Sequence, residues 1–197
     1  MTDWDLVIIP TPGDGSCLFH ALANAFFIPY RTERLNGNFI SRSTIISLFR
    51  QELAQSLENA YPKLANGNLP EFSKIVPDFT LDNMKTQLEN PSVHIGYGFF
   101  EFISNAINKD IYIINKNTNS LYNSDELQYS IKGNRYSIIL AYQNNHYELV
   151  GLKTGSTVLT LFKNDHPLIT HLFGEVQKII HPEKYLPKPM SPEPPHL

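Results

Sequence analysis

Cysteine is scarce in this sequence: only one of its 197 residues, Cys17, is a cysteine. A single cysteine excludes a disulfide within the chain and a zinc site built from several cysteines. No apolar run approaches the roughly 18 residues that a membrane span requires. The net charge of −3 offers no broad basic face for nucleic acid. We therefore expect no nucleic-acid partner, no membrane span, no metal and no cofactor.

The chain also lacks the pattern of a secretory signal, because its first five residues are Met-Thr-Asp-Trp-Asp. With its single cysteine, it fits a soluble protein of the reducing cytoplasm, or of the host cytosol for a viral or bacterial effector. We expect a monomer with one domain at residues 1–181. Residues 182–197 hold six of the 14 prolines and are predicted to be a tail or linker.

The most informative stretch is Gly-Asp-Gly-Ser-Cys at residues 13–17. Apolar residues follow Cys17 with helical spacing, so the cysteine is expected in the first turn of a helix that Asp14 or Ser16 caps. The helix dipole there favours a negative charge, lowers a thiol pKa and makes a cysteine nucleophilic. Two alternatives stay open: a buried structural cysteine, and a phosphate-binding loop, which the absence of a Lys-Ser/Thr pair disfavours.

A nucleophilic cysteine needs a base, and His146 has the most suitable setting among the seven histidines. It begins a predicted strand after an Asn144-Asn145 turn, and a strand holds a base rigidly. Glu148 shares its face of the strand and is a candidate to orient the ring. His20 is a weaker candidate, with its ring expected along the surface beside Cys17, and His94 in a polar loop stays open. The remaining four are interpreted as solvated: His166, His171, His181 and His196.

The order of apolar patterns predicts a mixed α+β domain, with helices first and strands later. Turns are expected at 59–79, and loops at 30–40 and 115–124. The expected helices are 17–28, 41–57, 80–88, 98–107 and 168–180. The expected strands are 6–9, 110–114, 136–142, 146–152 and 157–162.

Three segments, in this order, resemble motifs of the ovarian-tumour (OTU) deubiquitinases. Residues 14–19, Asp-Gly-Ser-Cys-Leu-Phe, are similar to the family's cysteine box. Residues 98–102 with the strand after them are similar to its middle helix, and residues 137–140 with His146-Tyr147 to its closing strand and His-aromatic box. The resemblance covers about residues 6–151. It implies a papain-like OTU fold with a central, mostly antiparallel sheet flanked by helices.

The resemblance also implies roles for individual residues. Cys17 would be the nucleophile and His146 the general base. The loop of Asp14, Gly15 and Ser16 would form the oxyanion hole through its backbone amides, with that of Cys17.

Gly98 and Tyr147 would contribute to substrate binding. Two positions depart from the family pattern. Glu148 stands where the family has Asp or Asn, so Asn145 or Asp5 are alternative orienting groups, and Tyr97 stands near the place of a missing tryptophan.

The function implied is a thiol protease of the ubiquitin conjugation pathway: a deubiquitinase that hydrolyses isopeptide bonds at the ubiquitin C-terminus. Its partners would be ubiquitin, polyubiquitin chains or a ubiquitin-like modifier. The alternatives are a papain-like protease or acyltransferase with another acyl donor, a catalytically idle ubiquitin-binding domain, and a structural domain in which Cys17 is only buried.

Overall fold

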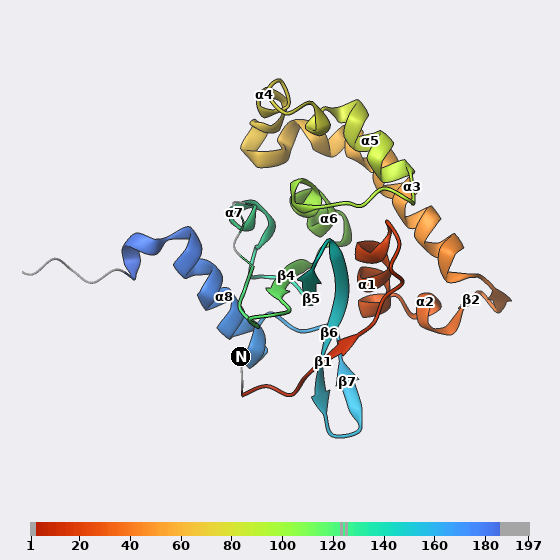
Figure 1. The fold of residues 1–197 in the computed structure, drawn as a ribbon, viewed down its shortest axis with the longest axis vertical. Coiled ribbons are helices and arrows are strands. Elements are labelled where there is room, and N and C mark those ends of the chain that lie inside the picture. The colour runs from red at the N-terminus through yellow and green to blue at the C-terminus, as the bar shows by residue number, and fades with distance from the viewer. Residues whose placement is uncertain (1–2, 123, 125, 186–197) are drawn as a thin grey trace, which may run out of the picture.

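A computed structural model describes residues 3–122, 124 and 126–185, which fold around one central sheet (Figure 1). The strands of this sheet are β1 (Leu6–Ile9), β4 (Asp110–Asn115), β5 (Ser137–Gln143), β6 (His146–Thr154) and β7 (Thr157–Leu159). The longer helices are α1 (Cys17–Phe26), α3 (Arg42–Ala60), α5 (Leu81–Glu89), α6 (Phe100–Ile107) and α8 (Pro167–Ile180). The short helices and hairpin strands are α2 (Ile28–Thr32), β2 (Arg34–Leu35), β3 (Asn38–Phe39), α4 (Leu69–Phe72) and α7 (Leu127–Ser130). The 3-10 turns are η1 (Tyr61–Gly67), η2 (Pro77–Phe79), η3 (Tyr97–Phe99) and η4 (Pro182–Lys184).

The sheet has the strand order β1-β6-β5-β4, with β7 paired to β6. Only β4 and β5 run parallel, and the other pairings are antiparallel. The prediction of a mostly antiparallel sheet flanked by helices is therefore confirmed. The parallel pair is explained by its connection, because β4 and β5 are joined by a crossover that contains α7 rather than by a tight turn.

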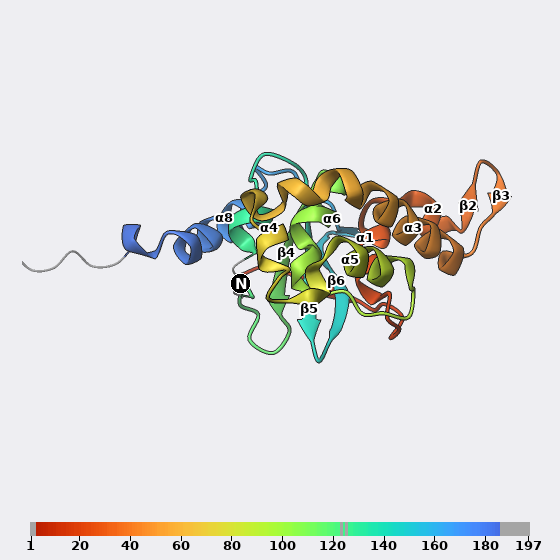
Figure 2. The same cartoon turned by 90° about the horizontal axis from the view of Figure 1, so that it is seen from above.

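Helices cover both faces of the sheet, and alternate strand residues enter two separate cores. Ile138 and Leu140 of β5 pack on the side of α1, α3, α5 and α6, whereas Ile139 and Ala141 pack on the side of α8. This coverage explains why β4 is buried along nearly its whole length. Figure 2 shows α8 and the β2–β3 hairpin projecting from opposite ends of the molecule.

The turn before His146 has the predicted form. Asn144 and Asn145 both adopt the left-handed conformation, with φ of 52° and 58°. This is the two-residue hairpin turn in which asparagine is favoured, and it pairs Gln143 with His146. The turn thereby fixes His146 at the first position of β6.

The prediction of a loop at residues 30–40 was wrong. The first helix ends at Phe26, and Pro29 then lies in the first turn of α2, where its missing N–H is harmless. The next residues form the β2–β3 hairpin around Asn36 and Gly37, with φ of 51° and 81°. An Asn-Gly pair between short strands is a strong hairpin signal that the polar composition concealed.

Two further predictions concern the C-terminal tail and membrane insertion. Most of the predicted Pro-rich tail, residues 186–197, lies outside the described residues, and its first residues form η4. Within the described part of the chain, every helix is too short or too polar to span a bilayer.

Candidate active site

Cys17 is the first residue of α1, and its side chain is 1% exposed. Its Sγ accepts a hydrogen bond from the backbone N–H of Tyr147 in β6, at 3.5 Å. The Nδ1 of His94 lies 4.0 Å from the same sulfur. The expectation of a lowered thiol pKa was wrong, because burial raises the pKa of Cys17 more than the nearby amides lower it. The resting side chain is therefore a neutral thiol, and catalysis would need a base close to it.

The loop before Cys17 is held by its own backbone and by one carboxylate. Asp14 accepts the N–H of Ser16 through Oδ1 at 2.9 Å and that of Cys17 through its carbonyl oxygen at 3.3 Å. Ser16 occupies the N-cap position of α1, but its hydroxyl donates to the carbonyl of Pro91 instead, so the expected side-chain cap was wrong. Within the described residues, the amides of Asp14 and Gly15 donate no hydrogen bond, which leaves both free for an oxyanion.

Gly15 is required by the close approach of a second loop. A Cβ added at Gly15 would lie 2.1 Å from the carbonyl oxygen of Ser92. The two backbones can meet only because residue 15 has no side chain. The cysteine loop and the loop at residues 90–96 therefore form one unit.

Arg50 of α3 connects these two loops, a role that no pattern in the sequence predicts. It is 0% exposed, and burial lowers its pKa to about 10, so it stays charged at neutral pH. Its guanidinium stacks on the ring of Phe19 at 4.6 Å. It donates hydrogen bonds to six acceptors in both loops and the end of α5: the carbonyls of Gly15, Gln87, Leu88, Pro91 and Val93 and the hydroxyl of Ser16.

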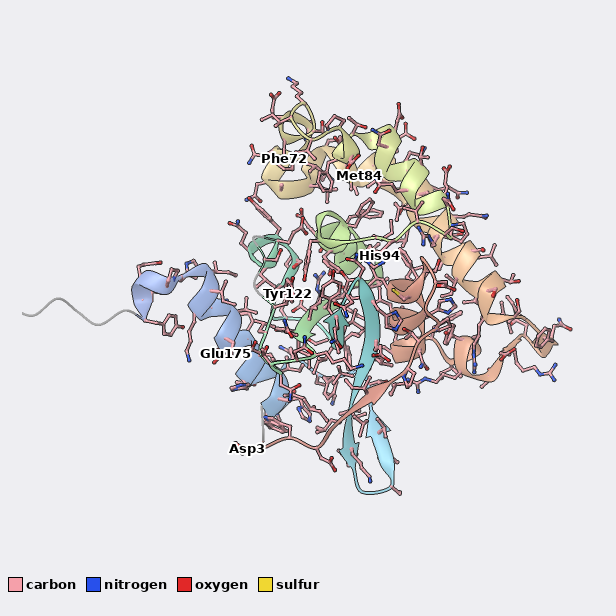
Figure 3. All side chains as sticks on the ribbon, viewed as in Figure 1. Asp3, Phe72, Met84, His94, Tyr122 and Glu175 are labelled. Atoms are coloured by element: carbon pink, nitrogen blue, oxygen red, sulfur yellow. The ribbon has the colours of Figure 1, made fainter. Side chains whose placement is uncertain are left out.

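His94 directly follows Val93, whose carbonyl oxygen accepts a hydrogen bond from Arg50. Figure 3 shows His94 beside the beginnings of β6 and α1. Its ring stacks on that of Tyr147, with 5.6 Å between centroids and 13° between planes. Burial lowers the pKa of His94, and the charges of His146 and Arg50 lower it further. His94 is therefore a neutral imidazole at neutral pH, in position to accept a proton from the thiol.

His146 begins β6, one residue before the amide that contacts Sγ, as the sequence predicts. In the described residues, no side-chain hydrogen bond joins His146 to any of the three candidate orienting groups. Glu148 pairs with Lys116 at 2.7 Å, and Asn145 accepts from the hydroxyl of Tyr142 at 2.8 Å. Asp5 lies opposite Lys153, seven residues along β6 and therefore roughly 23 Å away.

His20 does not lie along the surface as expected. It is 4% exposed, and its Nδ1 lies 2.7 Å from the hydroxyl of Tyr30. Its Nε2 lies 3.4 Å from the carboxylate of Asp14. His20 therefore supports the cysteine loop from the core. His166 is likewise not simply solvated, since its Nδ1 accepts the N–H of Leu168 and caps α8.

The two residues predicted to bind substrate have structural roles in this conformation. The side chain of Tyr147 is 1% exposed, so this residue reaches the site through its backbone N–H. A Cβ at Gly98 would lie 1.8 Å from the ring of Phe79, so this glycine allows the ring to pack. Tyr97 stacks on Tyr122, labelled in Figure 3, with ring centroids 5.2 Å apart.

Solved structures identify the fold. No protein-family model and no curated protein matches the sequence. The chain is similar to an OTU domain solved in complex with ubiquitin, with TM-score 0.55 and 17% identity over 91% of this chain and 87% of that one. It is also similar to the viral OTU domain protease of Taggert virus, with TM-score 0.50 and 18% identity over 80% and 85% of the two chains. The predicted OTU fold is thereby confirmed.

Proposed function

We propose that this chain is a cysteine isopeptidase that cleaves the bond between the C-terminus of ubiquitin and a substrate lysine. The observation that carries the proposal is the position of Cys17 within an OTU fold: its sulfur lies at the start of α1, against the first residues of β6, where His146 stands. One of the similar OTU domains was solved with ubiquitin bound.

In this mechanism, the thiolate of Cys17 attacks the glycyl carbonyl of ubiquitin, and the amides of Asp14 and Gly15 stabilise the oxyanion. His146 protonates the departing lysine amine, which leaves a thioester on Cys17. His146 then takes a proton from water, and the resulting hydroxide releases ubiquitin with a free carboxylate. Glu148 would orient His146 only after exchanging its contact with Lys116, so its removal is expected to cost less than removal of Cys17 or His146.

The test is hydrolysis of a fluorogenic amide at the ubiquitin C-terminus, followed by a panel of diubiquitins. The wild type should cleave both, whereas Cys17→Ala and His146→Ala should lose at least 99% of the activity. His171→Ala is a matched control, because His171 is exposed on α8, on the other side of the sheet. Binding of ubiquitin without cleavage would instead make the chain an idle ubiquitin-binding domain. Cleavage of only a ubiquitin-like modifier would change the substrate.

A further inference from the structure

We propose that His94 is a second catalytic histidine, which accepts the proton of the Cys17 thiol when the thiolate forms. The reaction then uses two imidazoles, with His94 at the sulfur and His146 at the leaving amine and the water. The role of His146 rests on the proposed function. The contact between His94 and Cys17 does not, and it can be tested without ubiquitin.

The geometry favours His94 for the first proton transfer. In the described residues, its Nδ1 is the only titratable side-chain atom that hydrogen-bonds Sγ. A base must lie within reach of the proton that it removes, and such contacts are often long before substrate binds. At 4.0 Å, the contact of Nδ1 with a sulfur atom fits this description.

The position of His94 is fixed from two sides. Its ring lies flat on Tyr147, whose own ring is fully buried against Tyr142 at 4.8 Å. The residue before it, Val93, is held through its carbonyl oxygen by Arg50 at 2.9 Å. A histidine held by the same arginine that holds the cysteine loop keeps a constant distance to the thiol, which is what proton transfer requires.

The charged groups around the pair are arranged for a transient ion pair. His94 is faced by Cys17 from α1, by His146 and Tyr147 from β6, and by Arg50 from α3. The positive charge of Arg50 favours the thiolate, and it disfavours the protonated form of His94. The ring is therefore neutral at rest and returns its proton readily.

The protons balance over the whole cycle. The S–H proton of Cys17 moves to Nδ1 of His94, and the thiolate forms the bond to the carbonyl carbon. His146 begins the cycle as the imidazolium, gives one proton to the amine and regains one from water. When the thioester breaks, Cys17 leaves as a thiolate and recovers its proton from His94, so both histidines end as they began.

Alkylation by iodoacetamide tests the proposal, because Cys17 is the only cysteine and each modified chain reports on this one thiol. The rate is measured from pH 5 to pH 10 on wild type, His94→Phe, His94→Gln and His171→Ala. His94→Phe keeps a flat ring against Tyr147 and removes only the titratable nitrogens. We expect both His94 variants to react about tenfold more slowly at pH 7. In these variants the thiolate forms without the imidazolium that proton transfer to His94 leaves beside it, and the lack of that cation raises a thiol pKa by about one unit. His171→Ala should follow the wild type.

Thermal unfolding of each variant verifies that the fold is intact. A wild-type pH profile in either His94 variant would overturn the proposal. Faster alkylation at every pH would also overturn it, because His94 would then only shield the thiol. These outcomes are independent of ubiquitin: an absence of cleavage with a shifted alkylation profile would refute the proposed function and leave the role of His94 standing.

Discussion

Replacement of Arg50 by methionine tests whether the candidate site depends on a buried cation. Methionine fills much of the same space but offers no donor, so each of the six acceptors loses the bond from Arg50. Two of these bonds, to Leu88 and Ser16, are fully buried. A buried acceptor left without its donor costs about 1–3 kcal/mol, whereas acceptors near the surface regain water. The desolvation cost of the guanidinium is recovered, which reduces the loss.

We therefore expect Arg50→Met to lower the free energy of unfolding by about 3 kcal/mol, which corresponds to roughly 6–12 °C in Tm for a chain of this size. The assay is urea denaturation followed by circular dichroism. Arg50→Lys should recover only part of the loss, because one ammonium group cannot reach the acceptors of both loops. Arg34→Met is the control: Arg34 is exposed in β2, and its replacement should change stability by less than about 0.5 kcal/mol. A loss below about 1 kcal/mol for Arg50→Met would refute the conclusion that Arg50 holds the two loops together.

Three further substitutions have defined outcomes. Gly15→Ala should force the cysteine loop away from Ser92 and reduce hydrolysis of the ubiquitin amide more than tenfold in a folded protein; unchanged kcat/KM would contradict the close approach. Ser41→Ala should cost about 1 kcal/mol in urea denaturation, because the hydroxyl of Ser41 caps α3 by accepting the N–H of Thr44. Burial raises the pKa of Glu126 from 4.5 to about 7, so the stability that its neutral form confers is present below pH 4.5 and is lost as pH rises through 7. Glu126→Gln should flatten this pH dependence of the unfolding free energy, and an unaltered slope would exclude Glu126 as its source.

Local signals in the sequence predicted the loop, the helix and the turn that carry Cys17 and His146. Gly15 and Cys17 lie where a loop meets a helix, and the Asn144-Asn145 turn sets the start of the strand that carries His146. These features depend on neighbours in sequence, and the resemblance to OTU motifs added their arrangement in space.

The residues that bring the loops together could not be predicted in this way. Arg50 lies 33 residues from Cys17 in a helix whose pattern gives no sign that one arginine is buried. His94 is in a polar loop, and contacts of that loop with Gly15, Arg50 and Tyr147, all distant in sequence, place it at the thiol. The raised pKa of Cys17 likewise follows from burial by distant segments, which a local argument from the helix dipole omits.

Covalent capture tests the central proposal most directly. A ubiquitin with an electrophile at its C-terminus is incubated with wild type, Cys17→Ala and His171→Ala, and the intact masses are measured. The proposal predicts a gain of one ubiquitin on wild type and on His171→Ala, none on Cys17→Ala, and a peptide map that places the bond on Cys17. An absence of adduct on wild type, while iodoacetamide still modifies Cys17, would contradict it.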